Sequence, residues 1–284
     1  MLSHQAKVKF KLFRDPFIDD VQSQDDVFLS SSQRYIRESL WHAARHGGFL
    51  ALVGESGAGK SVLRRDLAER IRREDQKVIL IQPATIEKAR LTASGICEAI
   101  LCDVSDGGVS AHGSLEMLAR RIGKILTDSS RAGYCHALII EEAHDLHKNT
   151  LKCLKRFWEM EDGFRRLLGI ILIGQPELKH KLDERVHHDV REVVRRCEIA
   201  ELLPLQEAVG PYLEQKFKRA GATLADILDE NAIDAVRQRL RRETGTEVQV
   251  MSYPLLVNNT VTRALNLAAD IGADRITPDI IMEL

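Results

Sequence analysis

One stretch of the sequence constrains the fold more than any other. Residues 54–61 read GESGAGKS, directly after the apolar run Phe49–Val53 and directly before a segment with helical spacing. Glycines at these positions let a loop turn its backbone N–H groups inward, and a lysine followed by a serine adds a positive charge and a hydroxyl. A loop of this kind between a strand and a helix is typical of phosphate-binding sites in α/β proteins.

Runs of β-branched and other apolar residues predict the strands of such a protein, and apolar residues three or four positions apart predict its helices. The expected strands are Phe49–Val53, Lys77–Ile81, His136–Ile140 and Leu168–Ile173. Ser61–Arg73 and Leu115–Leu126 are expected to be helices. This alternation favours a parallel sheet covered by helices.

The pattern changes near residue 204. After the run Leu202–Leu205 the strand signals stop, and helical segments follow at about 207–220, 230–242 and 254–271. Thr277-Pro278 starts a last helical turn. We therefore expect a sheet domain over residues 1–204 and a small helical lid domain over residues 205–284.

Composition limits the location and the partners. The formal net charge is −1, from 41 Lys and Arg against 42 Asp and Glu, so contact with a nucleic acid has to come from a local patch. The longest apolar stretch, Leu167–Ile173, is far shorter than the ~18 residues of a membrane span, and residues 1–16 lack the apolar run of a signal peptide. The five cysteines show no CxxC pair, which favours reduced thiols without a metal role. These features predict a cytoplasmic protein that does not bind a membrane.

The loop predicts a site for ATP and Mg²⁺. Lys60 is expected to place its charge at the β- and γ-phosphates during catalysis, and Ser61 to offer its hydroxyl to the metal. Nucleotide contacts are expected from the loop and the start of the next helix: Gly54, Glu55, Ser56, Gly57, Ala58, Gly59, Lys60, Ser61 and Val62.

Polar residues at the ends of two later strands are candidates for the rest of the site. Glu141 is expected to lie near Mg²⁺, and Glu142 to act as the general base on the attacking water. Aspartate is usual at the metal-side position, so Glu141 lengthens the arm by one methylene. Gln175 is the candidate for sensing the γ-phosphate, while His144 and His147 are expected to be polar surface residues.

Arginines precede the apolar run 199–205, where a final strand is expected. In ATPases that form rings or filaments, an arginine of one subunit stabilises charge on the phosphoryl group in its neighbour's site. Arg196 is the first candidate for this role and Arg195 the second, and Arg191 stays open.

Together these motifs resemble those of the AAA+ ATPases. The resemblance is closest to the ExeA-type branch, which includes the transposition regulators of the phage Mu B, TnsC and TniB type. It rests on FRDPF at 13–17, GESGAGKS at 54–61, IIEEAHDL at 139–146, LIGQPELKHKL at 172–182 and RRCEIAELLPL at 195–205. It covers residues 12–283, nearly the whole chain.

The resemblance implies an ATPase that assembles as a homo-oligomeric filament or ring on double-stranded DNA and delivers that DNA to a transposase. It implies that Phe17 and Phe28 flank the adenine. It also implies that Lys88, Arg90 and Thr92 contact the DNA backbone irrespective of sequence, with the loop Gly107–His112 as a competing contact.

Departures from the family pattern leave other functions open. Leu255 stands where many relatives carry an arginine that touches the γ-phosphate, so hydrolysis is expected to be slow, or stimulated by DNA or a partner. A nucleotide-switched adaptor with weak hydrolysis is one alternative. A cytosolic secretion-associated ExeA-like ATPase is another, although we expect neither the membrane helix nor the wall-binding domain of such proteins here. In contrast to the phage Mu protein, we also expect no separate DNA-reading domain.

Overall fold

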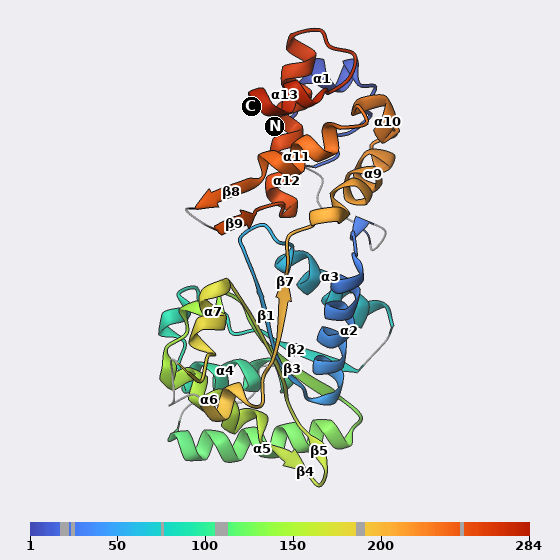
Figure 1. Ribbon diagram of the computed structural model, residues 1–284. Helices are drawn as coiled ribbons and strands as arrows, with labels where there is room; N and C mark the ends of the chain where they lie inside the picture. Colours follow the sequence, from blue (N-terminus) through green and yellow to red (C-terminus); the bar gives the residue numbers. More distant parts are fainter. Residues whose placement is uncertain (18–22, 24–25, 75–76, 106–112, 186–190, 245–246) are drawn as a thin grey trace. The chain divides into compact units, whose positions relative to one another are not determined.

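The structure is a computed structural model that describes residues 1–17, 23, 26–74, 77–105, 113–185, 191–244 and 247–284 (Figure 1). It divides into two compact units. The helical unit comprises Met1–Ser30, Ser56–Val62 and Leu203–Leu284, and the sheet unit comprises Ser31–Glu55 and Leu63–Leu202. Residues 1–30 thus group with the C-terminal helices, and the expected division into residues 1–204 and 205–284 stays a prediction.

Five parallel strands form the sheet, in the order β2-β3-β6-β1-β7. The four strands expected from the sequence are confirmed, with ends that differ by one residue, and the fifth lies in the run before residue 205. The strands are β1 (Phe49–Gly54), β2 (Val78–Ile81), β3 (Cys135–Ile140), β6 (Gly169–Gly174) and β7 (Glu198–Leu202). All pairs are parallel, so the five carboxyl ends lie at one edge of the sheet and the five amino ends at the other.

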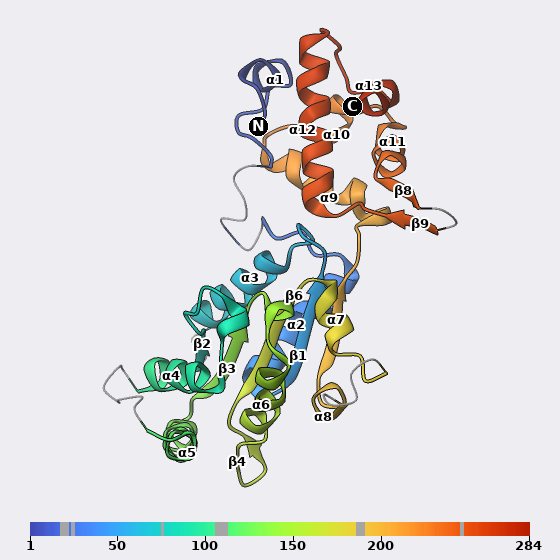
Figure 2. The ribbon, with the colours of Figure 1, turned by 90° about the vertical axis from the view of Figure 1, so that its left-hand side faces the viewer.

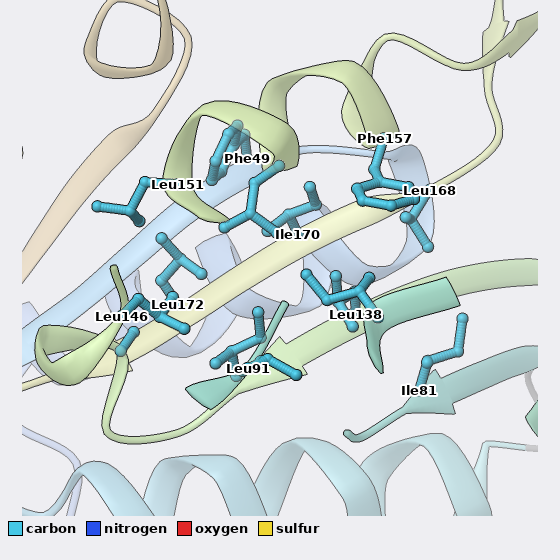
Figure 3. Packing of buried hydrophobic residues seen from close by; sticks show 14 of the residues in the cluster. Phe49, Ile81, Leu91, Leu138, Leu146, Leu151, Phe157, Leu168, Ile170 and Leu172 are labelled. Atoms are coloured by element: carbon cyan, nitrogen blue, oxygen red, sulfur yellow. The ribbon is translucent and has the colours of Figure 1, made fainter. Parts of the chain in front are cut away.

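Helices cover both faces of the sheet, which explains why its central strands are apolar throughout. Figure 3 shows one face, where Phe49, Leu138 and Leu172 pack with side chains of the covering helices, such as Leu151. The helices of this unit are α2 (Ser31–His46), α3 (Lys60–Arg73), α4 (Ala93–Val104), α5 (Leu115–Arg131), α6 (Lys148–Trp158), α7 (Pro176–Lys181) and α8 (Arg191–Val194). A short hairpin, β4 (Glu161–Asp162) and β5 (Arg165–Arg166), precedes β6.

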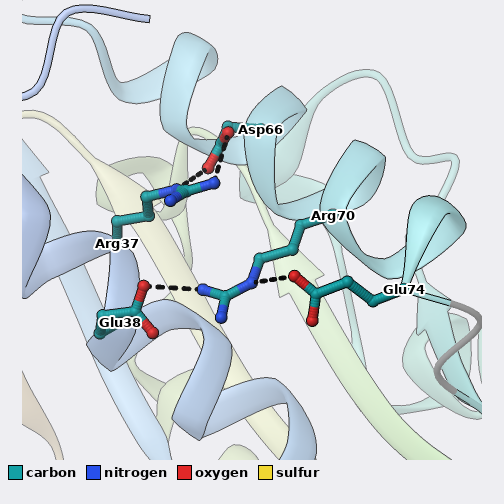
Figure 4. A network of polar contacts seen from close by, with 5 residues as sticks. All are labelled: Arg37, Glu38, Asp66, Arg70 and Glu74. Atoms are coloured by element: carbon teal, nitrogen blue, oxygen red, sulfur yellow. Dashed lines mark hydrogen bonds and ion pairs between the residues drawn. The ribbon is translucent and has the colours of Figure 1, made fainter. Parts of the chain in front are cut away.

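Ion pairs attach α3, the helix that follows the glycine-rich loop, to α2 (Figure 4). Arg37 binds both oxygens of Asp66, at 2.5 and 3.2 Å, and the Asp66 side chain is only 3% exposed. Arg70 joins Glu38 and Glu74 at 2.8 and 2.9 Å. Removing one partner of a buried pair costs about 3–5 kcal/mol, because the other charge is left without compensation. Within the sheet unit, α3 is therefore held on α2 at Asp66 and Arg70.

The helical unit contains six α-helices in its described residues and a two-stranded hairpin. Its helices are α1 (His4–Lys9), α9 (Val209–Arg219), α10 (Leu224–Ile227), α11 (Ala232–Arg239), α12 (Pro254–Asp270) and α13 (Pro278–Glu283), and Figure 2 shows the length of α12. They enclose an apolar core around Phe217, which is fully buried.

The hairpin corrects two sequence-based expectations. β8 (Arg241–Thr244) pairs with β9 (Glu247–Val250), so strands do occur after residue 205, and the helix expected over 230–242 ends at Arg239. Residues 241–247 contain no apolar residue that a helix could bury. Val248 and Val250 instead alternate with polar residues, which is the period of a strand.

Two further findings concern the whole described chain. No helix in the described ranges is long and apolar enough to cross a membrane. All five cysteines are free, and burial raises the pKa of the Cys97 thiol to about 11. That thiol is therefore protonated and unreactive at neutral pH.

Candidate nucleotide-binding site

The glycine-rich loop has the local geometry that phosphate binding needs. β1 ends at Gly54 and α3 begins at Lys60, each within one residue of the end predicted from the sequence. Gly57 and Gly59 adopt φ angles of +78° and +105°, which side chains disfavour. A Cβ atom at Gly59 would meet no atom within 4 Å, so space is open above that turn. The loop and the amino end of α3 thus fit a phosphate chain by their backbone alone.

Within the helical unit, the first turn of α12 contacts this loop. The backbone N–H of Leu255 donates to the Gly57 carbonyl at 3.2 Å, and a Cβ atom at Gly57 would overlap the Leu255 side chain. Buried Ser252 fixes the start of α12, because its two oxygens accept hydrogen bonds from the backbone of Leu205 and Gln206. Leu255 therefore packs on the loop as an apolar residue.

Three candidate residues of the sheet unit follow neighbouring strands at the same edge. Glu55 follows β1, Gln175 follows β6 and Glu141 follows β3, and these strands are adjacent in the order β3-β6-β1. Register places Val53 opposite Gly174 and Ile140 opposite Leu172. The carboxyl edge of the sheet therefore gathers the acidic and amide candidates where the loop begins.

Glu141 has a basic partner that the sequence did not suggest. Its carboxylate lies 3.2 Å from Nε of Arg64 on α3, and the side chain is 39% exposed. Nε of Arg64 is itself buried, and the described residues offer it no other hydrogen-bond partner. Carboxylate and hydroxyl oxygens are the donors that Mg²⁺ prefers, so Glu141 and Ser61 suit this metal by their chemistry. A metal at Glu141 would compete with Arg64 for the same carboxylate.

Glu142 occupies a strained position. Its φ and ψ angles are +50° and +39°, in the left-handed region, which costs a non-glycine residue about 1–2 kcal/mol. The side chain is 58% exposed, as a base that takes a proton from water requires. The turn starts the short 3₁₀ helix η3 (Ala143–Asp145).

His144 contradicts the expectation of a surface residue. Its side chain is only 14% exposed, and Nδ1 lies 3.4 Å from the backbone N of Gln175 and 3.5 Å from a carboxylate oxygen of Glu142. His147 differs, because it caps α6 by accepting a hydrogen bond from the Asn149 backbone. Both histidines follow a strand in a polar run, so sequence spacing alone could not separate them.

The aromatic residues expected to flank adenine pack within the helical unit. Phe17 lies edge-on to Phe217 at 5.8 Å between ring centroids, and Phe28 lies edge-on to Tyr212 at 5.4 Å. Both partners belong to α9. Much of the segment between Phe17 and Phe28 lies outside the described residues, and the adenine role of the two rings stays a prediction.

The candidate arginines lie at the opposite edge of the sheet. Arg195 pairs with Glu184 at 3.1 Å, and the Arg196 guanidinium lies 5.8 Å from the centroid of the Trp158 ring. They precede β7, whose first residue Glu198 pairs with Leu50 near the amino end of β1. Arg196 is therefore about a strand length from the carboxyl edge of its own sheet unit. Its role on the site of another subunit therefore stays a prediction.

The residues expected to contact DNA have local roles in their own loop. Lys88 donates to the carbonyls of Pro83 and Thr85 at 3.0 and 2.6 Å. Arg90 pairs with Glu87 at 2.7 Å, and the Thr92 hydroxyl caps α4. Carbonyls leave the charge of Lys88 uncompensated, so its DNA role stays a prediction, as do those of Arg90 and Thr92. The competing loop Gly107–His112 lies outside the described residues.

A cation-lined cavity of about 800 Å³ lies at the amino edge of the sheet. Arg45, Lys77 and Arg165 line it, and none of the three has a carboxylate partner among the described residues. Partial burial, His42, Arg45 and Arg165 together lower the pKa of His46, which also lines the cavity. Sequence reasoning missed this cluster, because its members come from three separate segments.

Comparison with known proteins agrees with this geometry. Residues 43–182, which include the loop, Glu141, Glu142 and Gln175, match the family described as the AAA domain. The structure is similar to Cdc6p from Pyrobaculum aerophilum, with a TM-score of 0.61 and 12% identity over 93% of this chain and 68% of that one. The fold is that of an AAA+ ATPase.

Further proteins are similar to this chain in structure or in sequence. Drosophila ORC bound to DNA has a TM-score of 0.59 and 12% identity over 99% of this chain and 65% of that one. General secretion pathway protein A of Aeromonas hydrophila is 28% identical over 260 residues, which are 89% of this chain and 44% of that protein. The chain therefore spans less than half the length of this homologue. Membership of the transposition-regulator group suggested by the motifs stays a prediction.

Proposed function

We propose that this protein binds ATP with Mg²⁺ and hydrolyses it, slowly when alone and faster on double-stranded DNA or with a partner. The carrying observation is the glycine-rich loop that starts at the carboxyl edge of the sheet, where Glu141, Glu142 and Gln175 also lie. Lys60 contributes a positive charge, and Ser61 and Glu141 are the residues that would hold the metal. Mg²⁺, when bound, neutralises charge on the β- and γ-phosphates.

In this proposal each polar side chain has one task. Glu142 accepts a proton from the attacking water, since its carboxylate is exposed at the strand end. Gln175 orients that water against the terminal phosphate. Arg196 acts on the site of an adjacent subunit, because its own carboxyl edge is a strand length away. Catalysis therefore depends on self-assembly.

We further infer that the assembly forms on double-stranded DNA and selects or activates a target for a DNA transposase. The motifs at 13–17, 139–146 and 172–182 support this function, as does the structural likeness to proteins solved with DNA, Drosophila ORC and ORC1 of Aeropyrum pernix. Lys88 and Arg90, repeated along a filament, would neutralise many phosphates despite the near-zero net charge of one chain.

The deciding experiment is negative-stain electron microscopy of the protein with double-stranded DNA, in ATP, a slowly hydrolysed analogue or ADP. Filaments or rings that need both DNA and a triphosphate support the proposal. Lys60→Ala is the control, and it should show none. Dispersed particles in every condition, together with no DNA-stimulated ATP hydrolysis, would contradict it.

A second candidate is a nucleotide-switched adaptor or secretion-associated ATPase. Its support is the sequence similarity to General secretion pathway protein A, together with Leu255 and Glu141 in place of the usual residues. Co-sedimentation with membranes instead of DNA, or a turnover unaffected by Glu142→Gln, would favour this candidate.

A further inference from the structure

His144 lies between two residues of the proposed site that are far apart in the sequence. It belongs to η3, which follows β3, while Gln175 follows the adjacent strand β6. Its side chain is 14% exposed, against 58% for Glu142 and 57% for Asp145 on either side of it. The ring is thus held at the carboxyl edge while its neighbours extend into solvent.

The hydrogen-bond partners of the ring assign its proton. The backbone N–H of Gln175 is always a donor, so Nδ1 must present its lone pair to it at 3.4 Å. A neutral ring then carries its proton on Nε2, which lies 3.8 Å from a carboxylate oxygen of Asp145. Nδ1 also lies 3.5 Å from Glu142, but a nitrogen that accepts from Gln175 cannot at the same time donate to that carboxylate.

Two backbone features bring the ring to this position. The left-handed conformation of Glu142 turns the chain back after β3. Gly174, the last residue of β6, allows a close approach, because a Cβ atom there would come within 3.2 Å of the His144 backbone N and 2.9 Å of Leu178. The left-handed backbone of Glu142 and the absence of a side chain at Gly174 are therefore both needed for the contact between η3 and Gln175.

We propose that His144 is a positioning residue that couples Gln175 to Glu142 through one of its two ring nitrogens, Nδ1. While Nδ1 accepts from Gln175, the backbone at the start of α7 is fixed relative to the turn that carries Glu142. A shift of Gln175 releases Nδ1 and removes the support of that turn. The proposal rests on the proposed ATP hydrolysis with Glu142 as the base.

Steady-state ATP hydrolysis of four proteins tests this: wild type, His144→Ala, His144→Asn and His144→Gln. His144→Ala should lower kcat roughly 10- to 100-fold, since displacing a reacting group by about 1 Å has effects of this size. KM and the dissociation constant for ATP should stay within about threefold, because the polar contacts of His144 join it to Glu142, Asp145 and Gln175. Asparagine places an oxygen acceptor near the position of Nδ1 and should restore most of kcat, whereas glutamine places its polar atoms near Nε2 and should not.

His147→Asn is the matched control, since it makes the same exchange three residues away and should leave kcat unchanged. If His144→Ala and His144→Asn lose kcat equally, or if KM rises as kcat falls, the positioning role is wrong while the ATPase stands. A wild-type protein that hydrolyses no ATP with or without DNA would contradict the proposed function itself.

A spectroscopic measurement keeps the test open if His144→Ala does not fold. Two-bond ¹H–¹⁵N spectra of ¹⁵N-histidine-labelled protein, assigned with His144→Asn, report which ring nitrogen carries the proton. We expect the Nε2–H form for His144 in the nucleotide-free protein. An Nδ1–H form would overturn the inference, because that nitrogen could not accept from Gln175.

Discussion

The two edges of the central sheet differ in charge although the same strands build them. The carboxyl edge holds Glu141, Glu142 and Gln175, and the glycine-rich loop begins there. The amino edge holds Arg45, Lys77, Arg165 and Arg196 around the hairpin of β4 and β5. One edge thus carries acids and an amide beside the loop, and the other carries mainly cations, with Asp162 among them and bound to Arg131.

Helix direction accounts for part of this difference. In a parallel sheet with crossover helices, amino ends of helices gather at the carboxyl edge and carboxyl ends at the amino edge. The partial positive charge at helix amino ends suits phosphates, and the carbonyls at carboxyl ends suit cations. Arg165 fits this account, since it donates to the carbonyl of Ser130 in the last turn of α5 and to that of Tyr134, which follows α5. The edges are therefore predisposed to different partners, and the predictions below test which edge performs which task.

The largest effect should come from Arg196. Arg196→Ala should lower hydrolysis by the assembled protein about 10³-fold, the lower end of what a charge-stabilising arginine supplied by a neighbour contributes. Arg166→Ala is the control, because Arg166 lies over the same Trp158 ring, 4.4 Å from its centroid. Mixing Arg196→Ala with Glu142→Gln should recover activity, because each variant supplies the group that the other lacks. If the mixture recovers nothing, the amino edge does not act on a neighbouring subunit.

The second-largest effect should distinguish an acidic residue at the carboxyl edge from one at the amino edge. Glu142→Gln should lower kcat about 10²-fold, within the range expected for removal of a general base, and leave ATP binding intact. Asp162→Asn makes the same exchange at the amino edge, where Asp162 binds Arg131 at 2.9 and 3.0 Å. It should change kcat less than twofold. Equal losses in a malachite-green phosphate assay would remove the distinction between the edges.

A smaller effect is expected on DNA binding. Lys88→Ala combined with Arg90→Ala should weaken binding to a random-sequence duplex and reduce the slope of log affinity against log salt by about 1–2, as for the loss of one or two phosphate contacts. Arg45→Ala combined with Lys77→Ala removes the same charge from the amino edge. Fluorescence anisotropy between 50 and 200 mM salt compares the pairs. If only the second pair of substitutions reduces the slope, the DNA binds at the amino edge and not at the loop of Lys88 and Arg90.

The smallest effect concerns stability at acidic pH. His136, near the start of β3, is buried, its Nδ1–H donates to the Leu167 carbonyl at 3.0 Å, and Nε2 accepts from Ser129 at 2.8 Å. Burial, with a contribution from Arg165, lowers the pKa of His136 in the folded protein. Between that pKa and the unfolded value of about 6.5 the unfolded chain binds more protons, so stability rises with pH and is lost as pH falls.

Urea unfolding at pH 7.5 and 5.5 measures how much His136 makes the stability depend on pH. The free energy of unfolding of the wild type should be about 1 kcal/mol lower at pH 5.5 than at pH 7.5. Each unit of pKa difference between the folded and unfolded states contributes at most about 1.36 kcal/mol. His136→Gln should be less stable at pH 7.5 but show a smaller fall between the two pH values. His147→Asn should keep the wild-type dependence. An unchanged fall in His136→Gln would show that other groups of the fold produce it.

Several parts of the molecule were predictable from local sequence. Strands β1, β2, β3 and β6 and helix α3 follow from periodicity, because each buries apolar residues at the spacing of its own type. The loop 54–61 follows from the glycine pattern alone. The hairpin β8–β9 was missed, since its strands are four residues long and surround a short connection, and such short elements have weak patterns.

The sequence by itself determined the α/β fold, the glycine-rich loop and the acids that follow β3, because periodicity and backbone chemistry are local properties. Only the tertiary structure decided which side chains meet. It paired Glu141 with Arg64, inserted His144 between Glu142 and Gln175, and gathered Arg45, Lys77 and Arg165 around one cavity. These contacts join residues that are distant along the chain, and they depend on strand order and helix packing, which no local pattern records.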